Sequence, residues 1–141
     1  MNYLKTYESF NDISNDVYVE RIDSDYDDEL IDMIGDDFNP NGSGFLGLFK
    51  KDSIIGGVMI EKDYLPWEYR FDVVISEKYR GKGYLKLLIN RLIERFNKDD
   101  EADQLSATVI NKGLTDVLVN KFGFNKGEFN GSDFVWIRKK V

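Results

Sequence analysis

The sequence predicts a single domain of mixed α/β class, in which helices flank one mixed β-sheet. The length of 141 residues suits one hydrophobic core, and a hydrophobic content of 42% excludes a disordered chain. Short segments rich in Val, Ile and aromatic residues alternate with segments of helical period. The helical segment 84–96 lies between two of the expected strands. Such a βαβ unit places its two strands parallel, through a right-handed crossover.

The N-terminal part of the chain is expected to hold an extension, a strand and a helix. Residues 1–16 are polar and show no sustained period, so they are predicted to precede a domain of residues 17–141. Residues 17–22 alternate as the first strand. The Asp and Ser residues that follow supply N-caps for a helix that Gly35 ends. Residues 36–44 are rich in Gly, Asn and Asp and are predicted to form turns.

Three strands are expected in the middle of the chain. Residues 45–50 and 54–61 form the first two, and the second of these is apolar on both faces and is therefore buried. Gly56 and Gly57 within it indicate a bulge or a close approach of another backbone. After a connector, residues 69–75 alternate as the third strand.

The C-terminal third is expected to add a strand, a helix and a final strand. Residues 105–110 form the strand that follows the 84–96 helix. Val117, Leu118 and Phe122 share one side of the next helix, and residues 134–138 close the chain as a strand. The sheet is therefore predicted to be mostly antiparallel, with six to seven strands and one parallel pair.

A basic turn, Arg80-Gly81-Lys82-Gly83, leads into the helix at 84–96. Helix N-termini carry partial positive charge and are usually stabilised by acidic residues. Here residues 77–98 hold seven basic and two acidic side chains, a local charge of +5 in a chain of net charge −7. Such crowding of positive charge costs free energy unless an anion binds, so the turn is predicted to hold a phosphate group. The alternative is an ordinary solvated connection between a strand and a helix.

The spacing of this turn disfavours two common phosphate-binding motifs. It lacks the Gly-x-x-x-x-Gly-Lys-Ser/Thr pattern, and Lys86 stands where a dinucleotide-binding turn has its third Gly. The turn instead resembles the coenzyme A loop of the GNAT superfamily of N-acetyltransferases, whose pattern is Arg/Gln-x-x-Gly-x-Gly/Ala. Arg80 and Gly83 match that pattern, and Leu85 departs from it at the last small position.

A second feature of the same superfamily follows further along the chain. Family members tend to end the helix after the next strand with Lys-x-Gly-Phe, and here Lys121-Phe122-Gly123-Phe124 stands in that place. The resemblance covers roughly residues 17–141. It implies one GNAT-like acetyltransferase domain whose parallel strands splay apart.

The resemblance also implies that acetyl-CoA binds as a co-substrate where the two parallel strands separate. Backbone groups of one strand would pair with the pantetheine, and N–H groups of the turn would hold the pyrophosphate. The expected coenzyme-binding residues are Val73, Val74, Ile75, Arg80, Gly81, Lys82, Gly83, Tyr84 and Leu85.

Acid-base groups are few in this chain. It has no His and no Cys, which excludes Ser-His-Asp and Cys-His mechanisms, and no metal is expected. Where many family members have a proton-donating Tyr, this chain has Val119. Where many have a basic Glu, it has Tyr69, with Glu68 and Asp72 nearby. Glu68, Tyr69 and Asp72 are therefore the candidate catalytic residues, Tyr69 as an acid and the carboxylates as bases.

The charge distribution predicts the kind of acceptor. Residues 8–37 hold twelve acidic side chains and one basic one, a net charge of −11. The resemblance places this region at the wall of the acceptor site, so an amine on a cationic small molecule or protein is expected. Nucleic acid is disfavoured by the overall charge. The alternative is that the acidic face only keeps the protein in solution.

Three functions therefore remain open. The first is acetyl transfer from acetyl-CoA to a primary amine by an N-acetyltransferase. The second is a coenzyme A-binding module of the same fold that has lost catalysis, and the third is an interaction protein with an acidic face. No apolar run approaches the ~20 residues of a membrane span and no leader is recognised, so no membrane association and a cytoplasmic location are expected.

Overall fold

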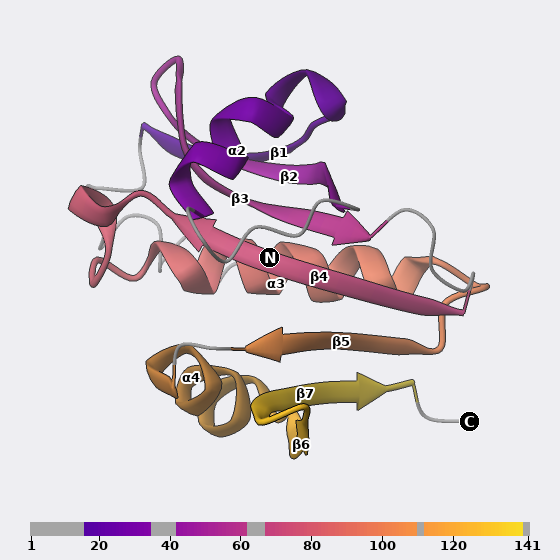
Figure 1. Cartoon of the computed structure of the whole chain (residues 1–141). Coiled ribbons are helices and arrows are strands. Elements are labelled where there is room, and N and C mark those ends of the chain that lie inside the picture. The colour runs from indigo at the N-terminus through magenta and orange to yellow at the C-terminus, as the bar shows by residue number, and fades with distance from the viewer. Residues whose placement is uncertain (1–15, 35–41, 62–66, 110–111, 140–141) are drawn as a thin grey trace, which may run out of the picture.

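The computed structural model describes residues 16–34, 42–61, 67–109 and 112–139, which form one seven-stranded sheet with helices on both faces (Figure 1). The strands follow one another across the sheet in the order β1-β2-β3-β4-β5-β7-β6. Their bounds are Val17–Arg21 for β1, Gly42–Lys50 for β2, Ser53–Glu61 for β3, Glu68–Ile75 for β4, Gln104–Val109 for β5, Asn125–Phe129 for β6 and Ser132–Arg138 for β7. The helices are α2 (Asp27–Ile34), α3 (Tyr84–Lys98) and α4 (Lys112–Phe122), with 3-10 turns η2 (Ser24–Tyr26) and η4 (Glu77–Tyr79).

The predicted fold class is confirmed. β4 and β5 pair in parallel, and every other neighbouring pair of described strands is antiparallel. α3 connects the two parallel strands, so the βαβ unit read from the sequence is present. The sheet is mixed and forms one domain, and its seven strands lie within the predicted range.

The helices cover different faces of the sheet. In the main core cluster, Leu88 of α3 and Leu118 of α4 are fully buried together with Phe71 of β4. Leu30 of α2 is fully buried in a separate cluster with Val74 of β4. Phe71 and Val74 are three residues apart on one strand and therefore point to opposite faces. α2 thus covers one face, while α3, which crosses behind β4 in Figure 1, and α4 pack against the other.

One boundary prediction is wrong in a way that tertiary pairing explains. β2 begins at Gly42, so residues 42–44, expected to form turns, are strand. They pair with residues 59–61 of β3, and the Gly44 N–H also donates to the Asp27 carboxylate at 2.6 Å. The pairing with β3 and the hydrogen bond to Asp27 of α2 therefore override the turn preference of these residues. The predicted extension 1–16, apart from its last residue, and the rest of the predicted turn segment lie outside the described residues.

β6 was not expected from the sequence, although a signal for it is present. Its side chains are mostly exposed, so it lacks the buried face that makes a strand visible in a hydrophobic pattern. A two-residue turn, Asn130-Gly131, joins it to β7, and φ is 52° at Asn130 and 83° at Gly131. Asn-Gly with positive φ at both residues is the preferred type I′ hairpin turn. This dipeptide could have predicted the hairpin.

Gly56 and Gly57 hold the close contacts that the sequence predicted. A Cβ on Gly56 would lie 2.6 Å from the carbonyl oxygen of Val74, and one on Gly57 would lie 2.7 Å from that of Leu46. The β2–β3 register also shifts next to Gly56, where the pairing passes from Leu48 to Phe49. Both the bulge and the close approach are therefore present, and they let β4 and β2 lie tightly against β3.

Candidate functional site

The parallel pair separates along its length. β4 and β5 pair over three residues each, Glu68–Arg70 with Gln104–Ser106. Beyond this point β4 continues to Ile75 paired only with β3, and β5 continues to Val109 paired only with β7. The space between the two diverging strands is a cleft of about 730 Å³.

Four elements besides β4 and β5 line the cleft. The turn before α3 and the first residues of that helix close one end, and α4 contributes Gly113, Leu114, Val117 and Lys121. Met33 and Ile34 of α2 reach the cleft from the opposite face of the sheet. The cleft is therefore lined by residues from both faces of the sheet.

The turn before α3 has the backbone expected for an anion-binding turn. Gly81 has φ of 75° and Gly83 has φ of 85°, values that L side chains rarely adopt. α3 begins directly after Gly83, no side chain caps it, and its first turn contains no acidic residue. The start of α3 therefore has no N-cap side chain and no first-turn carboxylate, which suits it to hold an anion.

Arg80 ties this turn to the end of β4. Its Nε donates to the carbonyl oxygen of Ile75 at 2.7 Å, and its side chain also lines the cleft. A guanidinium carries five N–H donors in a fixed plane, so this bond leaves donors that can reach an anion in the turn. The hydrogen bond thus holds the positive charge at the place where the strand ends and the helix begins.

Most of the residues expected to bind coenzyme A lie together around the cleft. Those that line it are Val73, Val74, Ile75, Arg80, Gly81, Gly83, Tyr84 and Leu85. Lys82 lines a neighbouring pocket instead. Tyr79, Thr108 and the α4 residues were not anticipated as lining groups. Only the tertiary contact of α4 with the end of β5 brings its residues there.

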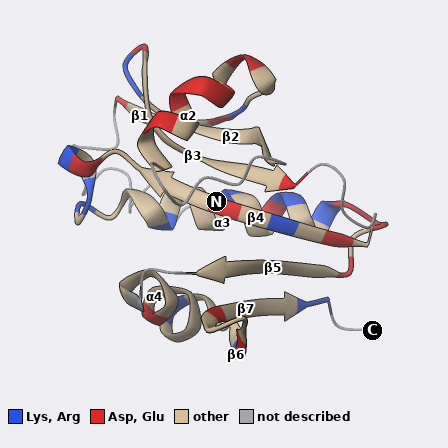
Figure 2. Cartoon of the chain, in the orientation of Figure 1, with Lys and Arg blue, Asp and Glu red and all other residues tan. Residues whose placement is uncertain are grey.

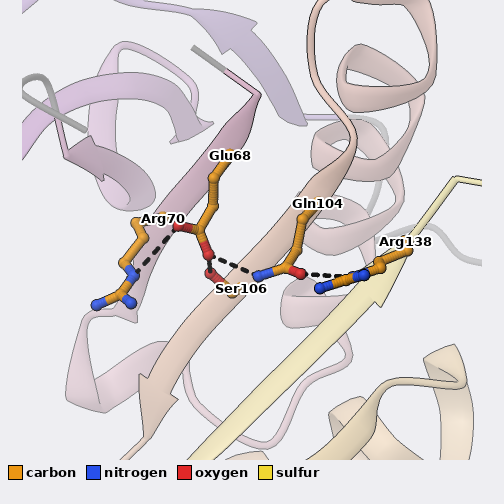
Figure 3. Close-up of polar contacts among 5 residues, drawn as sticks. All are labelled: Glu68, Arg70, Gln104, Ser106 and Arg138. Atoms are coloured by element: carbon orange, nitrogen blue, oxygen red, sulfur yellow. Dashed lines mark hydrogen bonds and ion pairs between the residues drawn. The ribbon is translucent and has the colours of Figure 1, made fainter. Parts of the chain in front are cut away.

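The candidate Glu68 lies at the closed end of the pair, in a polar network drawn in Figure 3. The side chain is 6% exposed, and its Oε2 accepts hydrogen bonds from Gln104 and Ser106, both at 2.7 Å. Oε1 lies 3.9 Å from Nε of Arg70, and Arg138 donates to the Gln104 amide at 2.8 Å. The network spans β4, β5 and β7 and fixes the point from which β4 and β5 diverge. Glu68 does not line the cleft.

Tyr69 faces the other side of the sheet. Its ring contacts Phe45 and Phe96, and its hydroxyl donates to the Asp99 carboxylate at 2.5 Å. Burial and this hydrogen bond hold the pKa of Tyr69 well above its usual value, and the same bond lowers the pKa of Asp99. Tyr69 does not line the cleft either, so of the three candidate catalytic residues only Asp72 does.

The remaining acid-base positions around the site are sparse. Val119 is half-buried and packs against the main core, so the place of the family Tyr holds an apolar side chain. The hydroxyl groups that line the cleft belong to Tyr79, Tyr84 and Thr108. Within the described ranges, no group of three or more His, Cys, Asp or Glu side chains is placed to hold a metal ion. None of the described helices is long and apolar enough to cross a membrane.

A parallel pair that opens over a glycine turn and a helix N-terminus is the arrangement that the resemblance to acetyltransferases led us to expect. The model of the acetyltransferase (GNAT) family matches residues 6–124. The chain therefore belongs to the GNAT family of acetyltransferases.

Solved structures agree with this assignment at the level of the fold. The yncA protein of Salmonella typhimurium, whose structure carries acetyl-CoA, has a TM-score of 0.67 and 13% identity over 88% of this chain and 94% of its own. A variant of SpeG, the spermidine N-acetyltransferase of Vibrio cholerae, has a TM-score of 0.66 and 14% identity over 87% and 94%. A Bacillus subtilis acetyltransferase in complex with CoA has a TM-score of 0.65 and 19% identity over 88% and 99%. No curated protein sequence matches the chain at a significant level.

Proposed function

We propose that this protein transfers the acetyl group of acetyl-CoA to a primary amine of a cationic acceptor. The observation that carries the proposal is the cleft between β4 and β5, which ends at a basic turn with two positive-φ glycines and an uncapped helix. An extended thiol ester that ends in a pyrophosphate matches that shape and charge. We also propose that the protein is cytoplasmic.

The donor is proposed to lie along the unpaired edge of β4. Backbone groups of Val73 to Ile75 have no β5 partner and would pair with the pantetheine as an added strand. The N–H groups from Gly81 to Leu85 and the Arg80 guanidinium would hold the pyrophosphate. This arrangement places the thioester between the two strands, next to the residues that reach the cleft from α2.

Transfer requires a neutral amine. The amine nitrogen attacks the thioester carbonyl, the carbon–sulfur bond breaks, and the proton from the nitrogen ends on the departing thiolate or on water. We propose Asp72, ahead of Glu68 and Tyr69, as the group that removes this proton, because it is the one carboxylate among the described lining residues. A backbone N–H beside the carbonyl would stabilise the oxyanion. The thiolate, with a pKa near ~8.5, leaves without a dedicated acid, which is compatible with an apolar Val119.

A cationic acceptor is supported by the charge on α2. Figure 2 shows acidic residues along this helix, and Asp27, Asp28 and Glu29 form its first turn. Met33 and Ile34 at the other end of the same helix line the cleft. An acceptor that enters along α2 therefore passes a negative surface before it meets apolar side chains. A polyamine, such as the spermidine of the Vibrio enzyme, has this character, as do an amino sugar and a lysine side chain.

A second candidate function is a coenzyme A-binding module of the same fold without catalysis. Two observations favour it: Val119 holds no proton donor, and Glu68 is enclosed in a hydrogen-bonded network away from the cleft. Under this alternative the cleft still binds coenzyme A, but Asp72 has no catalytic role.

The decisive experiment is turnover of acetyl-CoA with a panel of polyamines, amino sugars and lysine-containing peptides. Release of coenzyme A can be followed with a thiol reagent without background, because the protein has no Cys. We expect thiol release that depends on both acetyl-CoA and a cationic amine. Binding of coenzyme A in calorimetry without turnover of any amine would favour the non-catalytic module. Absence of both would leave only the interaction protein.

A further inference from the structure

A second, smaller pocket of about 350 Å³ adjoins the outer side of the basic turn. Its lining residues are Lys50, Lys78, Tyr79, Lys82 and Tyr84. Tyr79 and Tyr84 also line the main cleft, so the two hollows share a wall. A ligand that leaves the cleft at the turn therefore meets this pocket next.

The pocket gathers positive charge from three separate elements. Lys50 ends β2, Lys78 lies in η4, and Lys82 lies in the glycine turn. The Nζ of Lys50 is 5.9 Å from the centre of the Tyr79 ring, and that of Lys78 is 5.1 Å from it. No carboxylate of the described residues forms an ion pair with any of these three lysines. Three ammonium groups that line one small pocket repel one another, and an anion bound among them would offset that repulsion.

The chemistry of the proposed donor supplies such an anion. Beyond its pyrophosphate, coenzyme A carries a ribose with a 3′-phosphate dianion and a planar adenine. We propose that Lys50 and Lys78 bind the 3′-phosphate while the tyrosine rings contact the adenosine, so that the pocket selects coenzyme A over its 3′-dephospho form. This inference rests on the proposed function, because it extends the same donor beyond the cleft.

A competing exit for the donor runs between α3 and α4. Lys86 and Lys121 line the main cleft on that side. Tyr79 and Tyr84 line both hollows, so their rings are within reach of a base at either exit. The outer pocket offers three ammonium groups within about 350 Å³, against the two of Lys86 and Lys121. A phosphate dianion is matched better by the larger and more compact group of charges.

The test compares the affinity of the protein for coenzyme A and for 3′-dephospho-CoA by calorimetry. Wild type is expected to prefer coenzyme A by about tenfold or more, as one or two charge-assisted contacts supply. In the double variant Lys50→Ala, Lys78→Ala the preference is expected to fall towards one, through weaker coenzyme A binding with unchanged 3′-dephospho-CoA binding. The conservative variant Lys50→Arg, in which Lys78 is unchanged, is expected to keep the preference. Lys82 is left intact because it belongs to the pyrophosphate turn.

Lys98→Ala is a control for the loss of a lysine elsewhere on the surface, since it removes one positive charge from an exposed position at the far end of α3. It is expected to keep the full preference. Equal wild-type affinity for both ligands would overturn the inference and leave the proposed function intact. Loss of the preference in Lys121→Ala but not in the double variant would also overturn it and place the phosphate between α3 and α4. Failure of wild type to bind either ligand would overturn both proposals.

Discussion

The two halves of β4 are built in opposite ways. Residues 68–70 pair with β5 and are fixed by side chains on both faces, by the Glu68 network on one and the Tyr69–Asp99 hydrogen bond on the other. Residues 71–75 pair with β3 only and expose their second edge to the cleft. The closed half, residues 68–70, concentrates side-chain hydrogen bonds. The open half, residues 71–75, offers its backbone edge to the cleft.

The largest expected effect is at the turn that ends the open half. Gly83→Glu places a carboxylate where the pyrophosphate is proposed to lie, so coenzyme A affinity should fall by at least about a hundredfold in calorimetry. Gly131→Glu is the control, because Gly131 has φ of 83° against 85° for Gly83 and lies in the remote β6–β7 turn. Both variants carry the same backbone strain, and only the first should lose binding. Normal affinity in a folded Gly83→Glu protein would exclude the turn as the phosphate site.

The next effect concerns the carboxylate of the open half. Asp72→Asn keeps size and removes the proposed base, so kcat/KM should fall by about 10²–10⁴ and the acidic limb of its pH profile should disappear. Coenzyme A affinity should be unchanged within about twofold if Asp72 acts on the amine alone. A change in kcat/KM below about threefold would exclude Asp72 as the base and would contradict a catalytic role for the open half.

Glu68→Gln tests the closed half. It removes the charge that faces Arg70 and replaces one carboxylate oxygen with an NH₂ group. Because Gln104 and Ser106 already donate to this side chain, a hydrogen bond is lost, and the free energy of unfolding should fall by about 1–3 kcal/mol. Its kcat/KM, measured below the melting transition, should stay within about threefold of wild type. Should kcat/KM instead drop by two orders of magnitude with an altered pH profile, Glu68 is the base and the assignment of the two halves is reversed.

A smaller effect is expected for Arg80, which binds the last residue of β4 and also carries a positive charge beside the glycine turn. Arg80→Ala loses both the bond to the Ile75 carbonyl and a charge near the turn, so coenzyme A affinity should fall by about tenfold. The loss should shrink as salt is raised, because ions screen a phosphate contact. Arg80→Lys should retain part of the affinity. An effect that does not vary with salt would assign Arg80 to loop geometry only.

The smallest effect concerns the second anchor of the closed half. Tyr69→Phe removes the hydrogen bond to Asp99 and should lower the free energy of unfolding by about 1 kcal/mol at pH 7. The folded-state pKa of Tyr69 lies above its unfolded value, so this contribution is present at neutral pH and declines as pH rises beyond about 10. The folded-state pKa of Asp99 is lowered by the same bond, so the contribution is also lost in acid as Asp99 takes up a proton. Denaturation curves of wild type and variant should therefore converge in alkaline solution. A difference that grows in alkaline solution would contradict the assigned hydrogen bond.

The sequence predicts the local parts of this site well. The order of strand, glycine turn and amphipathic helix at 69–96 depends on short-range patterns, and α3 begins at the predicted residue, Tyr84. The positive φ at Gly81 and Gly83 is compatible with the glycine turn predicted there. These features were predictable because neighbouring residues determine them.

Features that depend on distant contacts were harder to predict. Lys50 and Lys78 lie near one ring only because β2 and η4 meet in the fold, and no local pattern reports that meeting. Residues 42–44 have turn chemistry but pair with residues 59–61 of β3. Glu68 has the composition of a catalytic candidate, and only its partners from β5 reveal an enclosed network. The missed β6 is different, since its Asn-Gly turn was available in the sequence.

The parallel pair is also the shortest pairing between neighbouring strands of the described sheet. β4 and β5 share three residue pairs, whereas the other neighbouring strands described here share five to eight. This short seam divides the sheet into an N-terminal part that ends with β4 and a C-terminal part that begins with β5. A donor molecule bound in the proposed position would contact both parts and hold them together until it dissociates. Saturation with coenzyme A at about 100 times its Kd would add about 2.7 kcal/mol to the free energy of unfolding. Amide hydrogen exchange along β5 should slow accordingly, as opening of the seam then requires release of the ligand.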